Sequence, residues 1–140
     1  MPKMKISCKE FADKLVGLLK GYGFIVQRYD AKSSHSIYLK LDWGACYTIR
    51  ISDHESKKHW LKYRFNVNVK SKEQNKQIKF HDGFKRIYYT GGMIQALLTD
   101  IRDTRTEKKL YGEAHYRHWM NVCRDMGEGK QGFWEQAVVV

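Results

Sequence analysis

The chain has 140 residues, of which 42% are hydrophobic and 14% aromatic, which excludes a largely disordered protein and is enough for the core of one domain. Its 26 Lys and Arg against 15 Asp and Glu give a formal net charge of +11, which favours a polyanionic partner, most often nucleic acid, over a charge that serves only solubility. Three widely spaced cysteines without a Cys-x-x-Cys pair argue against a disulfide framework, and no apolar run approaches the ~20 residues that span a bilayer. We therefore expect a single domain, 1–140, in a reducing cytoplasm, with no membrane partner.

Residues 7–22 predict a helix. Ser7 and Glu10 have the spacing of a capping box, in which the Ser7 hydroxyl accepts from the Glu10 N–H and the Glu10 side chain reaches back to the Ser7 N–H. Gly21 and Gly23 can each take the left-handed conformation that ends a helix. The apolar side chains recur at spacings of three and four and form one stripe: Phe11, Ala12, Leu15, Leu18, Leu19 and Tyr22.

Residues 24–70 predict an antiparallel sheet of about four strands. The first strand is a short apolar run, and the next three alternate apolar and polar side chains. Their ranges are 24–29, 37–42, 47–52 and 61–70. Asp42-Trp43-Gly44 is expected to form the turn between the second and third strands.

The alternation assigns a buried face and a solvent face to the central strands. In the third strand Tyr47, Ile49 and Ile51 are expected to face the core, with Thr48, Arg50 and Ser52 on an open, polar and cationic face. The fourth strand has the same pattern. Leu61, Tyr63, Phe65, Val67 and Val69 lie on one side, and Lys62, Arg64, Asn66, Asn68 and Lys70 lie on the other.

The rest of the chain predicts two helices within 92–126 and a tail at 127–140 that adds an edge strand or frays. Residues 71–79 predict a polar connection with a weak strand at its end, and 83–89 can be assigned to neither state. In the first helix one face is apolar, with Met93, Ile94, Leu97, Leu98 and Ile101. In the second helix the residues near one side are Tyr111, Ala114, His115, His118, Trp119, Val122 and Met126. The fold class expected is α+β: an N-terminal helix, an antiparallel sheet of about four strands, then two helices packed on one face.

The positive charge is concentrated in the middle of the chain. Residues 57–86 contain ten basic side chains and two acidic ones, Glu73 and Asp82, with aromatic residues between them. Lysine and arginine neutralise phosphates, and an exposed aromatic ring can stack on an unpaired base. The alternative is that these lysines form a solvated rim around a core tyrosine. The residues predicted to bind nucleic acid or a nucleoprotein are Lys40, Arg50, Lys57, Lys58, Lys62, Arg64, Lys70, Lys72, Lys76, Lys79, Lys85 and Arg86.

Two other groups of residues could carry chemistry. Asp53-His54 could act as an acid–base pair, although Asp53 could equally bond backbone N–H groups in a turn. His115 and His118 can share one side of a helix, but two histidines without a third and fourth ligand make a weak metal site, and a packed helix face is the alternative. With no phosphate-binding glycine loop either, we expect no catalytic residue, cofactor or metal.

Three stretches carry a resemblance to known proteins: Lys-Ser-Ser-His-Ser-Ile-Tyr at 32–38, Ile-Arg-Ile-Ser-Asp-His at 49–54 and Asn-Val-Asn-Val-Lys at 66–70. They resemble small proteins of phages and mobile elements, among them a family of anti-CRISPR inhibitors. The resemblance implies a role against host defence in the cytoplasm of a bacterial host cell. It singles out the motif residues Ser34, Ser36, Tyr38, Arg50, Ser52, Asp53 and His54.

Three functions follow from these observations. The first is an inhibitor that binds a nucleic-acid-guided effector, such as a CRISPR nucleoprotein, through a basic surface. The second is a general DNA- or RNA-binding accessory protein of a phage or mobile element. The third is a small nuclease centred on Asp53 and His54. The oligomeric state does not follow from the sequence.

Overall fold

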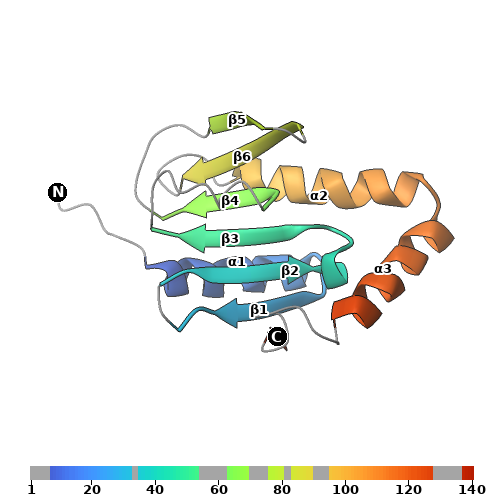
Figure 1. Cartoon of the computed structure of the whole chain (residues 1–140), viewed down its shortest axis with the longest axis horizontal. Coiled ribbons are helices and arrows are strands. Elements are labelled where there is room, and N and C mark those ends of the chain that lie inside the picture. The colour runs from blue at the N-terminus through green and yellow to red at the C-terminus, as the bar shows by residue number, and fades with distance from the viewer. Residues whose placement is uncertain are drawn as a thin grey trace.

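The computed structural model of the chain describes residues 7–32, 35–53, 63–69, 76–80, 83–89, 95–127 and 137–140. Within 76–80 and 83–89 it describes the backbone and, of the side chains, that of Tyr88. Figure 1 shows an α+β arrangement in which one sheet is accompanied by three helices. The elements in chain order are α1 (Cys8–Gly21), β1 (Val26–Asp30), β2 (Ile37–Leu41), the 3-10 helix η1 (Asp42–Gly44), β3 (Thr48–Ser52), β4 (Phe65–Asn68), β5 (Lys76–Phe80), β6 (Gly83–Tyr89), α2 (Gln95–Leu110), α3 (Glu113–Gly127) and β7 (Val138–Val139).

The predicted α+β class is confirmed, and the sheet is larger than expected. In the described part of the chain it has seven strands in the order β5-β6-β4-β3-β2-β1-β7. Four pairs of neighbouring strands are antiparallel, and β4 lies parallel to both β3 and β6. The undecided segment 83–89 is therefore a strand, and the tail contributes the short edge strand β7.

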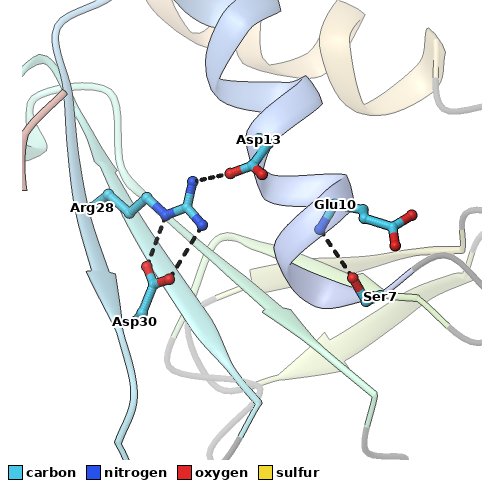
Figure 2. A network of polar contacts seen from close by, with 5 residues as sticks. All are labelled: Ser7, Glu10, Asp13, Arg28 and Asp30. Carbon is cyan, nitrogen blue, oxygen red and sulfur yellow. Dashed lines mark hydrogen bonds and ion pairs between the residues drawn. The ribbon is translucent and has the colours of Figure 1, made fainter.

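The helix α1 begins and ends as the sequence predicts. The Glu10 N–H donates to Ser7 Oγ over 3.1 Å, and Gly23, with φ of 84°, follows the last turn. Figure 2 shows how α1 is tied to β1. The Arg28 guanidinium lies between two carboxylates, 2.7 Å from Asp13 Oδ1 on α1 and 2.7 Å from Asp30 Oδ1 on its own strand.

The core lies between the sheet and two helices, α1 and α2, because side chains of both belong to one buried cluster. Alternate residues of the central strands face it, as predicted for Ile49, Ile51, Phe65 and Val67. The described part of the predicted α2 stripe is likewise confirmed, since Leu97, Leu98 and Ile101 are buried, whereas Met93 and Ile94 lie outside the described residues. The other buried apolar side chains of the cluster are Cys8, Phe11, Ala12, Leu15, Leu19, Phe24, Val26, Ile37, Leu39, Leu41, Cys46, Val69 and Tyr88.

The predicted apolar face of the third helix is wrong. Trp119 is 48% exposed, and Ala114, His115 and His118 are also exposed, whereas Tyr116 is buried. The reason is that α3 packs against η1 and not across the sheet. It therefore buries one tyrosine against the β2–β3 connection instead of a row of side chains along one face. Figure 1 shows α3 beside that connection.

None of the helices in the described ranges is both long enough and apolar enough to cross a membrane.

Candidate functional site

The face of the sheet opposite the core is polar, as predicted, but its centre is not open. Ser52 and Asn68 are 2% and 0% exposed, and Arg50 is 3% exposed. The expectation of a solvent-exposed cationic face is therefore wrong at Arg50. Alternation separates polar from apolar faces, whereas burial depends on what packs over them, and polar groups that bond one another can be buried. We call the following residues the buried polar layer: Gln27, Ser36, Arg50, Ser52, Asn66 and Asn68.

Arg50 sits in the middle of this layer because of the strand register. It lies opposite Tyr38 of β2 and Asn66 of β4. Its guanidinium carbon is 6.0 Å from the centroid of the Tyr38 ring. The centroids of the Tyr38 and Tyr63 rings are 5.4 Å apart. The Asn66 amide donates to the Tyr63 carbonyl over 2.9 Å, and burial raises the pKa of Tyr63 to about 12. Arg50 and its neighbours therefore form a packed layer inside the protein.

Most of the described residues of the motif suggested by the resemblance thus lie inside the fold. Ser36, Arg50 and Ser52 are buried and Tyr38 is half-buried, whereas Ser34 and His54 lie outside the described residues. Asp53 is partly exposed, and its Oδ2 lies 3.7 Å from Nδ1 of the exposed His35. Of the predicted acid–base pair, Asp53 alone is described, and the histidine beside it is His35.

The other predicted binding cations divide into three groups. Arg64 is exposed and Lys40 is half-buried. The backbones of Lys76, Lys79, Lys85 and Arg86 belong to β5 and β6, but their side chains are outside the described part. Lys57, Lys58, Lys62, Lys70 and Lys72 lie wholly outside the described residues.

The connection between β2 and β3 has an unusual backbone. Asp42, Trp43 and Tyr47 have φ values of 49°, 59° and 71°, and Gly44 has 98°. Left-handed conformations of non-glycine residues cost about 1–3 kcal/mol each and gather at functional sites. Because the chain turns here, Tyr47 precedes β3 instead of belonging to it, and it is 41% exposed. The prediction that Tyr47 faces the core is wrong for this reason.

A buried ionic network holds this connection in place. The Asp42 side chain is 0% exposed; its Oδ1 accepts from the Ile25 N–H over 3.0 Å, and its Oδ2 lies 3.0 Å from Arg105 Nε and accepts from the Tyr116 hydroxyl. Arg105 also donates to the carbonyls of Tyr22 and Gly23, over 3.2 and 3.0 Å. One carboxylate therefore joins α2, α3 and the residue before β1 to the turn. Burial, together with the hydrogen bond to Asp42, raises the pKa of Tyr116.

Cations from two separate segments lie over the exposed ring of Tyr47, and a third lies against the turn that precedes it. Lys108 Nζ of α2 lies 4.3 Å from the ring centroid, and the Arg64 guanidinium carbon, just before β4, lies 5.6 Å from it. The third is Lys40 of β2, whose side chain crosses the turn: a Cβ added to Gly44 would come within 2.9 Å of Lys40 Cε. We call Lys40, Tyr47, Arg64 and Lys108 the Tyr47 corner.

Two of these cations are held partly out of water. Burial lowers the pKa of Lys40 and that of Lys108 below the ordinary 10.5, although the neighbouring Cys123 acts in the opposite sense on both. A partly desolvated ammonium group gains more from an anionic ligand than a fully hydrated one does. The corner therefore combines an exposed aromatic ring with cations suited to an anion.

The two histidines of α3 are engaged with a tryptophan. The Trp119 indole N–H donates to His115 Nε2 over 3.0 Å, and the His118 ring meets the same indole edge-on at 6.1 Å. Over the described ranges, no group of three His, Cys, Asp or Glu is placed to hold a metal ion.

Sequence reasoning included Lys40 and Arg64 among the binding residues but missed Tyr47 and Lys108. The one available signal was the neighbourhood of Asp42-Trp43-Gly44, since a turn beside Tyr47 can rotate it out of the strand pattern. Comparison with protein-family models, curated proteins and solved structures finds no match to this chain. The resemblance to phage proteins stays a prediction.

Proposed function

We propose that this chain is a non-enzymatic protein of a phage or mobile element that binds and inhibits a nucleic-acid-guided effector, such as a CRISPR nucleoprotein, in the cytoplasm of the host cell. The observation that carries the binding part is the pair of cations, Arg64 and Lys108, over the exposed ring of Tyr47, with Lys40 against the neighbouring turn. The net charge of +11 supports it, because such a charge attracts polyanions from a distance. The role against host defence is supported by the resemblance at 32–38, 49–54 and 66–70.

The chemistry of the Tyr47 corner suits nucleic acid. Lysine and arginine neutralise phosphates and release counterions, which makes affinity fall steeply with salt. The tyrosine ring adds an apolar surface that every base can meet with its π face. A membrane surface would favour the same cations, but it offers no base for the exposed tyrosine ring to stack on.

The second candidate is a general DNA- or RNA-binding accessory protein. It is favoured by the same corner, because an exposed ring surrounded by cations can bind an accessible strand without help from an effector protein. The two candidates differ in whether free nucleic acid is a sufficient ligand.

A binding series on the full chain separates them. Fluorescence anisotropy would compare a free guide RNA, a short duplex DNA and assembled CRISPR effectors at two salt concentrations, with target cleavage as the second readout. We expect tight binding to an effector, inhibition of its cleavage, and a loss on Arg64→Glu/Lys108→Glu of roughly one unit of salt slope for each cation removed.

The matched control is Lys14→Glu/Lys20→Glu, which makes the same change of charge on exposed positions of α1. Equal losses in the two double variants would show that net charge alone drives binding. Equal affinity for free nucleic acid and for effector would support the accessory role, and no binding to any of these ligands would overturn the proposed function.

A further inference from the structure

We infer that the Tyr47 corner binds an unpaired nucleobase, so that the nucleic acid is single-stranded where the protein contacts it. This inference rests on the proposed function and adds the class of ligand. It is carried by how Tyr47 is presented and by what surrounds its ring.

The backbone holds Tyr47 firmly while its ring faces outward. The Tyr47 N–H donates to the Gly44 carbonyl over 3.2 Å, and the Tyr47 carbonyl accepts from the Leu41 N–H over 3.2 Å. The turn itself is fixed from below by the buried Asp42 carboxylate. Because the backbone at Tyr47 is already held by these bonds, less conformational freedom remains to be lost when the ring stacks, which favours its use as a platform.

A stacking platform discriminates between paired and unpaired bases. In a duplex both faces of an internal base are covered by its neighbours, whereas an unpaired base can offer one face to a tyrosine. The cations then have a second role. Lys108 Nζ lies over the ring, 4.3 Å from its centroid, so a base that stacks on that face displaces it, and the displaced ammonium group can then meet a phosphate beside the base.

The rest of the described surface provides a comparison. Tyr22 is also exposed, at 43%, and Arg102 of α2 lies 4.9 Å from its ring centroid. The backbone of Tyr22, however, has the ordinary φ of a helix end, −84°. Among the described residues no second cation lies over its ring. Exposed Trp119 already donates its indole N–H to His115. The Tyr47 corner is therefore the better site for a nucleotide, and Tyr22 provides the control.

The test is an anisotropy titration of the full chain with a labelled ~12-nucleotide single strand, the same strand with abasic sites, and a duplex of equal length. We expect the abasic sites to weaken binding roughly 5- to 150-fold, the range that corresponds to one lost base stack. Tyr47→Ala should remove most of the difference between intact and abasic strands, and Tyr47→Phe should preserve it. Tyr22→Ala should leave it unchanged.

Because Tyr47 has a positive φ, Tyr47→Asn provides a second variant, since asparagine accepts this conformation more readily than most residues. The abasic comparison uses the unaltered protein, so it does not depend on any variant folding. Equal affinity for intact and abasic strands, or tighter binding to duplex, would overturn the inference while leaving the proposed function standing. Failure to bind any nucleic acid, free or within an effector, would overturn the proposed function itself.

Discussion

Asp42→Asn is expected to lower the free energy of unfolding by about 3–5 kcal/mol, because it leaves the guanidinium of Arg105 without its buried counter-charge. The side chain is 0% exposed, and Oδ2 lies 3.0 Å from Arg105 Nε. Asparagine has the same shape and tolerates the positive φ of position 42, so the change isolates the charge from backbone strain. Urea unfolding, with an unchanged dependence on denaturant, measures the difference.

Asp30→Asn is the matched control. Asp30 also pairs with an arginine, Arg28, but its side chain is 51% exposed. Exposed pairs contribute about 0–1 kcal/mol, so this variant should remain close to the unaltered protein. A loss for Asp42→Asn no greater than that of Asp30→Asn would contradict the assignment of Asp42 as the anchor of the β2–β3 connection.

Arg50→Ala is expected to destabilise the fold by about 2–4 kcal/mol while leaving the affinity of the folded protein for nucleic acid unchanged. Arg50 is 3% exposed within the buried polar layer, so its removal creates a cavity and deprives buried polar neighbours of a partner. Chemical unfolding gives the first quantity, and anisotropy at a temperature where the variant is folded gives the second.

Arg64→Ala should behave in the opposite way. Arg64 is exposed and lies near the Tyr47 ring, so its loss should change stability by about 0.5 kcal/mol or less and weaken binding. If Arg50→Ala instead kept the stability and lost binding, Arg50 would act as a contact residue, and its burial in the polar layer would not account for its role.

The sequence predicted the elements whose signals are local. The Ser7–Glu10 spacing identified the start of α1, and alternation identified the core residues Ile49, Ile51 and Val67. The parallel pairing of β4 with β3 and β6 could not be predicted, because no local pattern specifies which strands far apart in the chain become neighbours.

The candidate site was harder to predict, for two physical reasons. Side-chain polarity assigned Arg50 to the polar face correctly but did not reveal that this face is covered. The Tyr47 corner brings together residues 40, 47, 64 and 108, and depends on left-handed backbone at Asp42 and Tyr47 that the residue types do not suggest. Tyr116 was missed because its role is set by where α3 docks.

The most direct test of the account is to map the nucleic-acid contact on the ¹⁵N-labelled chain by amide chemical shifts during titration with a short single strand. The account predicts that the largest changes occur at Gly44, Tyr47, Arg64 and Lys108, with small changes at Tyr22 and Arg102. Changes that instead centre on Tyr22 and Arg102, or that spread evenly over exposed lysines such as Lys14 and Lys20, would contradict the assignment of the Tyr47 corner as the binding site.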